Sequence, residues 1–579
     1  MRISRVKIQN YRNLKDVDVE LSGIVALIGE NNSGKSNFLR ALSIPLSNDD
    51  GLSSKRLSWY DINNGAKRQY FDFIRTNRDS ILNGCITVDK FIVSVPVVTI
   101  QLFLKPDDTE HYDTNEILLN ADGSFLGGIL YKFFIKNPEE LLQRVKSILK
   151  ATEEKEDVQL SLLPIELYEY SITVPGKGSK VSYDTLSKFR VAGLPINRDG
   201  FALDSDRIGS KALSNLLNNQ LEVESVVKIE KAYKEFFNII RSEGKLDEVL
   251  NWQEYSEIKN AHDFFKEVSV LPNMPPMSSI LNSVSLGYGE ESMFMQGLGN
   301  RNLILMAVLL NSYMNKSHDI SFRLLTVEEP EAHLCINNIL LMAQLFSIFS
   351  QKNSYTQIMY STHSTEFVNK LGLDKIIVLH DGATFALSTE LTPVECDYLA
   401  ANPNTDIFKM LYSRKLILVE GLTEELLIKS YLQTKKELND IKVLSFHKGF
   451  LKIIGIWKKI NRNTTNKLGV VRDFDNEPNA KEHHEKEQNE NVIVRTTEEY
   501  TLETDITSSN YQLLRQKYGE VYGWTNLSLE DLQSDWRKRK SDVMLRICHD
   551  LVEGELDGFV MPPHIREIID FMQKESDEG

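Results

Sequence analysis

The segment Gly29–Ser36 constrains the fold of this chain more than any other feature of its sequence. It reads GENNSGKS and matches the phosphate-binding loop pattern G-x-x-x-x-G-K-S/T at every fixed position. The apolar run Ile24–Ile28 before it suits a buried strand, and the segment Asn37–Leu42 after it suits the start of a helix. A strand, a glycine-rich turn and a helix in this order predict an ATP-binding α/β domain rather than a chance glycine-rich turn.

The residues of this loop have different tasks in binding a nucleotide. Its glycines let backbone N–H groups turn inward around the phosphates. Lys35 can reach the β- and γ-phosphates, and the Ser36 hydroxyl can ligate magnesium. The predicted ATP-binding residues are Gly29, Asn31, Asn32, Ser33, Gly34, Lys35, Ser36 and Asn37.

Two adjacent carboxylates follow a second apolar strand. The strand expected at Leu324–Val327 leads directly into Glu328 and Glu329. Beside a P-loop, one such carboxylate holds magnesium and its waters, and the other orients the attacking water. We assign Glu328 to the first task and Glu329 to the second. An acidic first turn of a helix that begins at Pro330 explains the same residues, and both interpretations can hold together.

His363 comes just after a third expected strand, Gln357–Tyr360. An imidazole at a strand end beside the γ-phosphate can sense or polarise that phosphate. A histidine without a catalytic role is the alternative. The order of the strands, with this one next after the acidic pair, favours the catalytic interpretation.

A second α/β pattern begins after the linker-like segment 400–405. The buried strand Leu416–Val419 turns into a helix at Glu420. Open α/β sheets place their sites at the carboxyl ends of the strands, so Glu420 is a candidate ligand. Glu424 lies in the first turn of the helix, near enough to share a cation with it.

Further acidic residues continue this second pattern. The strand Leu468–Val471 runs into Asp473 and Asp475, whose carboxylates suit magnesium or manganese. Glu503 and Asp505 supply another acidic pair at the close of the unit. Each of these segments alone is weak evidence, but their order along the chain is much more specific.

The formal net charge of −15 argues weakly against a nucleic-acid partner. Metal-holding carboxylates contribute to this sum, and a local basic groove can coexist with it, for which 537–540 and 452–459 are candidates. No apolar run of about 18 residues and no apolar signal core occur, so we expect a cytoplasmic protein without a membrane partner. The scattered cysteines predict neither a zinc site nor a disulfide framework.

The segments 31–37, 324–334 and 361–364 resemble those of the ABC-type ATPases of the SMC and RecF group. The opening segment 6–14 looks like the first strand and turn of that group. Its members cap the ATP of a partner subunit with a signature loop, and the resemblance implies this role for Gly297 and Gly299. The usual serine before these glycines is missing, so a glycine loop without such a contact is the alternative.

The C-terminal order of strand-Glu-Gly-x-x-Glu, strand-Gly and strand-Asp-x-Asp resembles the Toprim domain of topoisomerases, primases and certain nucleases. With the ATPase half, it is similar to the overcoming-lysogenisation-defect (OLD) family, including Gabija-type nuclease subunits. The resemblance implies two metals, and Lys540 as the basic residue that stabilises the phosphate during cleavage, with an exposed helix charge as the alternative. The implied metal ligands are Glu420 and Glu424 in one set, and Asp473, Asp475, Glu503 and Asp505 in the other.

The predicted fold is therefore an ABC-type ATPase domain with a helical insertion, followed by a Toprim Rossmann-like α/β domain. The ATPase lobes are expected at 1–135 and 266–395, the mainly helical insertion at 136–265, and the Toprim domain at 408–579. Insertions of this kind often dimerise in the family, so we expect a homodimer or a higher homo-oligomer. The insertion is too short for the long coiled-coil arm of SMC proteins.

These observations predict an ATP-regulated endonuclease that hydrolyses DNA with two Mg²⁺ or Mn²⁺ ions. The family resemblance implies defence against phage and allows for a protein or RNA activator. A RecF-like or SMC-like DNA-binding ATPase is one alternative, and a nucleotide sensor with a non-catalytic Toprim module is another. A topoisomerase would need a large gate, but the ATPase half occupies that space. A bacterial-type primase would need a zinc module, which the scattered cysteines do not supply.

Overall fold

A computed structural model gives the fold of most of the chain. The residues that it describes are 1–48, 55–106, 117, 127–151, 158–196, 208–245, 257–258, 271, 275–281, 283–314, 320–353, 355–380, 383–401, 406–446, 449–462 and 464–574. The chain divides into two compact units, and we describe each by itself. The first unit combines 1–187 with 359–579, and the second spans 188–358.

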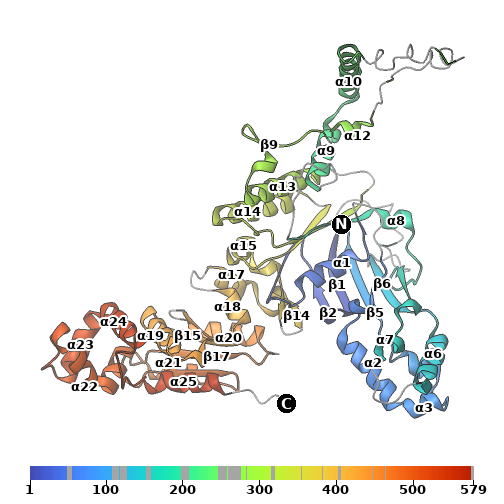
Figure 1. Cartoon of the computed structure of the whole chain (residues 1–579). Helices are drawn as coiled ribbons and strands as arrows, with labels where there is room; N and C mark the ends of the chain where they lie inside the picture. The colour runs from blue at the N-terminus through green and yellow to red at the C-terminus, as the bar shows by residue number, and fades with distance from the viewer. Residues whose placement is uncertain are drawn as a thin grey trace. The chain divides into compact units, whose positions relative to one another are not determined.

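The first unit contains a five-stranded antiparallel sheet (Figure 1). Its strand order is β2 (Leu14–Glu20), β1 (Arg2–Tyr11), β5 (Val98–Lys105), β6 (Gly127–Ile135) and β7 (Tyr168–Thr173). Alternate residues of β5 are buried, as expected for a sheet with one face in the core. The sheet supports the turn between β1 and β2, which lies beside the P-loop.

The P-loop strand belongs to a second sheet of this unit. The strand order here is β14 (Ala383–Ala386), β13 (Ile376–His380), β3 (Ile24–Gly29) and β12 (Thr356–Ser361), whose last residues belong to this unit. Strands β3 and β13 are parallel, and every residue of β3 is buried, which is typical of a strand covered on both faces. Helix α1 (Lys35–Ser43) follows the loop.

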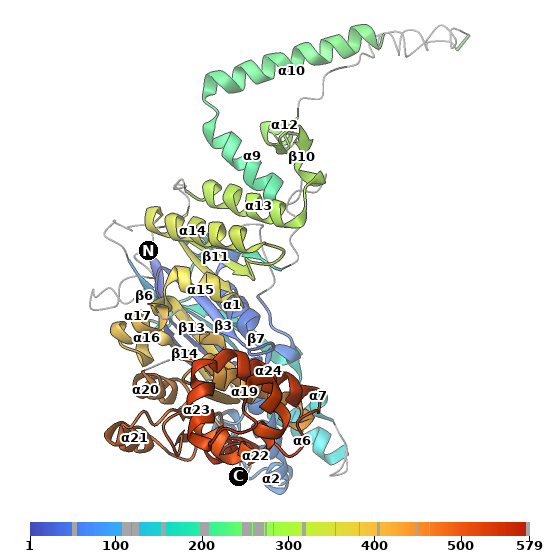
Figure 2. The ribbon, with the colours of Figure 1, turned by 90° about the vertical axis from the view of Figure 1, so that its left-hand side faces the viewer.

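The second unit is built from a parallel strand pair and helices. Strand β8 (Phe189–Leu194) pairs with β11 (Phe322–Glu328). Figure 2 shows α10 (Val223–Glu243) extending away from α13 (Leu298–Ser312) and α14 (Ile336–Lys352). None of the residues of α10, all of which the structure describes, is buried.

The C-terminal part of the first unit is a parallel α/β fold. Its four-stranded sheet has the order β16 (Ile441–Ser445), β15 (Lys415–Val419), β17 (Lys467–Arg472) and β18 (Val492–Thr496). A large apolar core fills one face of this sheet. The helices that supply this core are α19 (Leu422–Gln433), α22 (Leu502–Tyr522), α23 (Leu529–Lys538), α24 (Lys540–Val552) and α25 (Pro563–Gln573).

The structure describes further elements in both units, among them a two-stranded sheet of β9 (Gly287–Tyr288) and β10 (Glu291–Ser292). The remaining helices are α2 (Asn64–Thr76), α3 (Arg78–Leu82), α4 (Val88–Ile92), α6 (Pro138–Ala151), α7 (Gln159–Leu162), α8 (Tyr183–Ser187), α9 (Ile208–Gln220), α12 (Met277–Leu281), α15 (Thr365–Leu371), α16 (Leu387–Glu390), α17 (Pro393–Ala401), α18 (Ile407–Tyr412), α20 (Phe450–Ile460) and α21 (Pro478–Glu485). A further short strand is β4 (Ser47–Asn48).

The predicted α/β fold class is confirmed. The four domain segments proposed from sequence stay predictions. The two compact units have other boundaries and do not correspond to these segments. In the segment proposed as a helical insertion, the structure has strands β7 and β8 as well as helices α6 to α10. Among the described helices, none combines the length and the apolar character that a membrane crossing requires.

Candidate functional site

The P-loop connects Gly29 at the end of β3 to Lys35 at the start of α1. Gly34 has a φ of +109°, and an added Cβ would lie 2.6 Å from the Asn13 side chain, so only glycine fits there. The buried Lys35 folds back over the loop, where Nζ donates to the carbonyls of Gly29 (2.8 Å) and Glu30 (2.9 Å). The loop thus holds its cation close to the backbone amides that would face a phosphate.

One buried polar atom in this loop also fits a phosphate ligand. Within the described part of the chain, the Ser33 hydroxyl is buried without a hydrogen-bond partner. Such groups are normally paired, and a nucleotide phosphate would supply an acceptor. ATP therefore fits the residues that are present.

The turn between β1 and β2 supports the P-loop, which the sequence did not indicate. Arg12 Nη1 donates to Asn37 Oδ1 (2.8 Å), and its Nε is 2.8 Å from Asp61 Oδ1. Asn13 accepts from Asn37 Nδ2 (2.8 Å) and donates to the Asn32 carbonyl (3.3 Å). Arg12 has a φ of 49° and Asn10 a φ of 58°, uncommon values for non-glycine residues that mark a constrained turn.

In the second unit, the acidic pair and the glycine loop are joined. Glu328 ends β11, and Glu329 has a φ of 43°. Asn302 of α13 donates to the carbonyls of Pro330 (3.2 Å) and Ala332 (3.0 Å). These bonds fix the acidic segment against the helix that the glycine loop begins.

Gly297 and Gly299 lie at the N-terminus of α13, with Gly297 as its N-cap. An added Cβ on Gly299 would lie 2.5 Å from the His333 carbonyl, so the close approach of this backbone requires glycine. His363 is exposed in the first unit. The amide of Thr362 just before it donates to the Leu27 carbonyl of β3 (3.0 Å), which brings His363 to the end of β3 that carries the P-loop.

In the C-terminal fold, the structure brings four predicted carboxylates together, and we call Glu420, Glu424, Asp473 and Glu503 the carboxylate cluster. Glu420 and Asp473 follow the adjacent parallel strands β15 and β17. Glu420 Oε2 accepts from the Asp473 amide at 3.1 Å. Glu424 and Glu503 are buried in the first turns of α19 and α22. The cluster therefore lies at the carboxyl edge of the sheet, as in other open α/β sheets.

Burial and mutual repulsion shift the protonation of this cluster. Burial, then the charges of Glu424, Glu420 and Glu503, raise the pKa of Asp473 to about 8, although Lys540 opposes this. The pKa of Glu424 is also raised, chiefly by burial and by Glu503 and Glu420. Carboxyl groups that cannot all ionise near neutral pH are typical of functional sites.

Lys540 is the cation of this site. It begins α24, and its Nζ is 3.1 Å from Glu503 Oε2. Burial alone would lower the pKa of Lys540, but Glu503 and the other carboxylates raise it overall. The ammonium therefore stays charged beside the cluster.

Two threonines and a helix N-terminus complete the site, and sequence reasoning missed them. Thr501 Oγ1 donates to Glu503 Oε2 (2.8 Å), and the Leu502 amide donates to Asp473 Oδ1 (3.1 Å). Thr497 Oγ1 accepts from the Phe474 amide (2.8 Å). A threonine just before an acidic helix turn is a capping signal, which could have identified Thr501 but not Thr497.

The structure places Asp505 and Asp475 differently from the cluster. Asp505 accepts from the amides of Glu498 and Glu499 (both 2.8 Å), and His564 Nδ1 is 3.1 Å from its Oδ2. Asp475 lies in the turn after β17 with a φ of 49°. Asp505 therefore anchors the loop before α22.

The chemistry of the donors fits a hard divalent cation. The cluster offers carboxylate oxygens alone, and the buried Glu503 Oε1 has no hydrogen-bond partner among the described residues. However, in the described part of the chain no three histidine, cysteine, aspartate or glutamate side chains form a group that could hold a metal ion.

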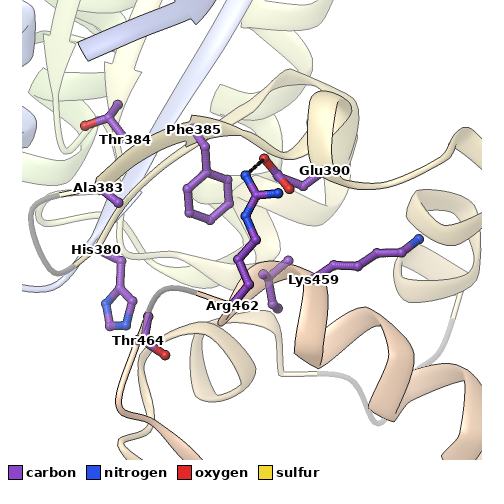
Figure 3. A pocket seen from close by; sticks show the side chains of 9 residues that line it. His380, Ala383, Thr384, Phe385, Glu390, Lys459, Arg462 and Thr464 are labelled. Atoms are coloured by element: carbon purple, nitrogen blue, oxygen red, sulfur yellow. Dashed lines mark hydrogen bonds and ion pairs between the residues drawn. The ribbon is translucent and has the colours of Figure 1, made fainter. Parts of the chain in front are cut away.

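A separate pocket of about 140 Å³ contains none of the predicted site residues (Figure 3). Strands β13 and β14 line one side of it and the end of α20 another, with Arg462 paired to Glu390 at 3.1 Å. Beside it, Lys459 pairs with Glu395 (2.6 Å), and the buried amide of Asn466 is 3.1 Å from His380 Nε2. We call these three contacts the joint between β13–α17 and the C-terminal fold.

Comparisons with known proteins agree with the first part of this description. The family model described as "AAA ATPase domain" matches residues 1–368. Endonuclease GajA of Bacillus cereus strain HuB5-5 is 21% identical over 504 residues, which cover 76% of this chain and 68% of that protein. Endonuclease GajA of strain VD045 is 21% identical over 451 residues, covering 76% and 69%.

Solved structures with some similarity include Stu0660 of Streptococcus thermophilus, at 9% identity and a TM-score of 0.34, covering 79% of this chain and 93% of that one. The SMC head domain from Thermotoga maritima has 12% identity and a TM-score of 0.27, covering 66% and 98%. TM-scores this low carry no argument, so the family assignment rests on the match to the family model. Because that match covers more than half of its residues, the chain belongs to the AAA ATPase domain family.

Proposed function

We propose that this protein is an ATP-regulated, metal-dependent DNA endonuclease. The observation that carries the proposal is the carboxylate cluster at the carboxyl edge of the parallel sheet, with Lys540 beside it. The similarity to proteins named endonuclease GajA supports it. An ATPase domain and an acidic, oxygen-only site in one chain fit a nuclease that nucleotide regulates.

Each residue has a task in this proposal. The carboxylate cluster, with Asp475 and Asp505, would hold Mg²⁺ or Mn²⁺, which supplies a hydroxide nucleophile and neutralises the oxygens around phosphorus. Lys540 stabilises the added negative charge of the phosphate as the bond breaks. At the nucleotide, Lys35 and Ser36 bind phosphate and magnesium, Glu328 supports that magnesium, Glu329 orients water, and His363 contacts the γ-phosphate.

The proposal extends to partners. The substrate is DNA, the working form is a homodimer or a higher homo-oligomer, and a protein or RNA activator can take part. The family resemblance of the motifs supports a role in defence against phage.

The test is the cleavage of supercoiled plasmid with Mg²⁺ or Mn²⁺, in the presence and absence of ATP. Wild-type chain, Glu420→Ala and Lys35→Ala are compared, and circular dichroism verifies folding. Loss of cutting in Glu420→Ala supports the nuclease site, and Lys35→Ala gives the direction of ATP control. Cutting that survives in Glu420→Ala rejects the site assignment.

A second function has one observation in its favour. Lys540 already neutralises Glu503, with its Nζ 3.1 Å from Glu503 Oε2. This favours a DNA-binding ATPase or nucleotide sensor with a non-catalytic C-terminal fold. No cutting under any metal or nucleotide condition, with intact ATP hydrolysis, would support this alternative.

A further inference from the structure

Arg472, the last residue of β17, is a buried cation with little compensation. Its exposed fraction is 6%, and its Nη1 has no hydrogen-bond partner in the part of the chain that the structure describes. Among the described carboxylates, the exposed Glu477 forms an ion pair with it, at a long distance of 3.9 Å from Nη2. Burying a guanidinium is costly unless strong hydrogen bonds and an anion compensate for the lost water.

Thr496 is a second uncompensated polar group beside it. It is opposite Arg472 in the parallel pairing of β17 with β18, and its exposed fraction is 5%. Its Oγ1 also has no hydrogen-bond partner among the described residues. Two neighbouring buried groups that can both donate a hydrogen bond indicate a missing acceptor.

Arg472 and Thr496 face the opposite side of the sheet from the apolar core. Val471 and Ile493 belong to that core, and side chains alternate along a strand. The residue after Arg472 is Asp473 of the carboxylate cluster. Arg472 and Thr496 therefore lie at the same carboxyl edge of the sheet as the carboxylate cluster, but their side chains are on the face opposite the apolar core.

The backbone at this edge is held in place. The Thr497 amide donates to the Arg472 carbonyl (3.0 Å), and Thr497 Oγ1 accepts from the Phe474 amide (2.8 Å). The position of Arg472 is thus tied to that of Asp473. An anion bound by Arg472 would be placed at a fixed offset from the cluster.

We propose that Arg472 and Thr496 bind a backbone phosphate of the nucleic-acid strand whose neighbouring phosphodiester lies at the carboxylate cluster. This inference rests on the proposed function and names a substrate-positioning site for it. A guanidinium donates two parallel hydrogen bonds to a phosphate, and the threonine hydroxyl donates a third. The phosphate also supplies the negative charge that the buried arginine lacks.

Fluorescence anisotropy of labelled single-stranded and duplex DNA, in EDTA at several salt concentrations, tests this on the full chain. Arg472→Gln is expected to weaken binding by about 10- to 100-fold and to lower the slope of log Kd against log salt by about one. Thr496→Val is expected to weaken binding by about five-fold without changing the slope, because it removes no charge. The slope separates a phosphate contact from a purely structural role.

Arg495→Gln is the matched control. Arg495 precedes Thr496 on β18, but its guanidinium contacts Glu567 and Gln488 on the other face. The control is expected to keep both affinity and slope. If Arg472→Gln fails to fold, Arg472→Lys replaces it in the test. Lysine keeps the positive charge but lacks the two parallel N–H donors of the guanidinium, so this variant is expected to keep the salt slope and to bind DNA more weakly.

Unchanged affinity and slope in a folded Arg472 variant would overturn the proposal. Stabilisation of wild type by inorganic phosphate, absent in Arg472→Gln while DNA binding is unchanged, would identify free phosphate as the ligand and also overturn it. Failure of the proposed function looks different: DNA binding through Arg472 would persist, while the wild-type chain would not cut in any metal.

Discussion

The P-loop and the carboxylate cluster are the two sites for which we propose phosphate chemistry, but they are built in opposite ways. The P-loop is one continuous segment, and neutral backbone carbonyls satisfy its cation Lys35. The cluster gathers residues from Glu420 to Glu503, with Lys540 on a further helix. Burial, and then the neighbouring carboxylates, raise the pKa of Asp473 and Glu424. The first site is preformed by local geometry, whereas the state of the second depends on protons and cations.

The largest expected effect tests whether the two sites are chemically independent. Asp473→Asn should reduce DNA cleavage by roughly 10³-fold, because several kcal/mol of transition-state stabilisation depend on a metal-bound cluster. ATP hydrolysis should stay at the wild-type rate. Cleavage and phosphate-release assays on the same preparation measure both rates.

Asp440→Asn is the control for this variant, since Asp440 precedes β16, at the opposite end of the strands from the cluster. It should cleave and hydrolyse ATP normally. A parallel loss of ATP hydrolysis in Asp473→Asn would show that the comparison between independent sites is wrong.

The next variant, Glu329→Gln, changes a residue predicted to act in ATP hydrolysis and leaves the carboxylate cluster intact. Glu329→Gln should lower ATP hydrolysis by about 10²–10³-fold, as expected for the loss of a group that acts on the attacking water. Binding of a fluorescent ATP analogue should be retained, because Lys35 and the P-loop are unchanged. An unchanged hydrolysis rate would remove Glu329 from the catalytic assignment.

A smaller effect should appear in the pH dependence of stability. The folded pKa of Asp473 is about 8, above its usual value of 3.8, so the folded chain keeps a proton that the unfolded chain has lost. The proton on Asp473 therefore favours folding of the chain most below about pH 4. This contribution to the free energy of unfolding is lost as the pH rises through about 8. Asp473→Asn should therefore gain a few degrees in Tm over wild type at pH 8–9 and little at pH 5.

Mn²⁺ should reduce the Tm difference between Asp473→Asn and wild type at high pH, because protons and cations compete for the same carboxylates. Differential scanning fluorimetry with and without Mn²⁺ measures it. A constant Tm difference across the pH range would mean that the carboxylates are not coupled in solution.

The smallest effect concerns the joint. Lys459→Gln should cost only about 0–1 kcal/mol, because its ion pair with Glu395 is partly exposed and solvent-screened. Its value lies in a double-mutant cycle with Glu395→Gln that is read on DNA cleavage with and without ATP. A coupling energy that changes with ATP would show that the joint transmits nucleotide state, and a constant one would exclude it.

Sequence reasoning anticipated the features that depend on local order. The strand, turn and helix of the P-loop, and the position of Glu420 at the carboxyl end of a strand, followed from the local sequence pattern. The buried strands also lie where the apolar runs placed them, within a few residues. Local pattern is enough for such features because strand and turn chemistry is local.

Features that depend on packing between distant segments were not predictable. His564 Nδ1 lies 3.1 Å from Asp505 Oδ2, and a separate helix brings it there. The burial of Arg472 is set by the tertiary fold, since a charged residue at a strand end is normally exposed. Pairing of this kind has no signature in a single sequence.

The joint also limits how this protein can be divided. Asn466 is almost fully buried, and it pairs with His380 at the end of β13, whose residues pair in turn with the P-loop strand. A fragment that starts at residue 408 would lose His380. The Asn466 amide would keep its hydrogen bond to Asn461 Oδ1 (2.8 Å) but lose this contact, at a cost of about 0.5–1.5 kcal/mol. The C-terminal fold therefore depends on β13, and chimaeras that exchange this fold between relatives should keep β13 and the segment after it.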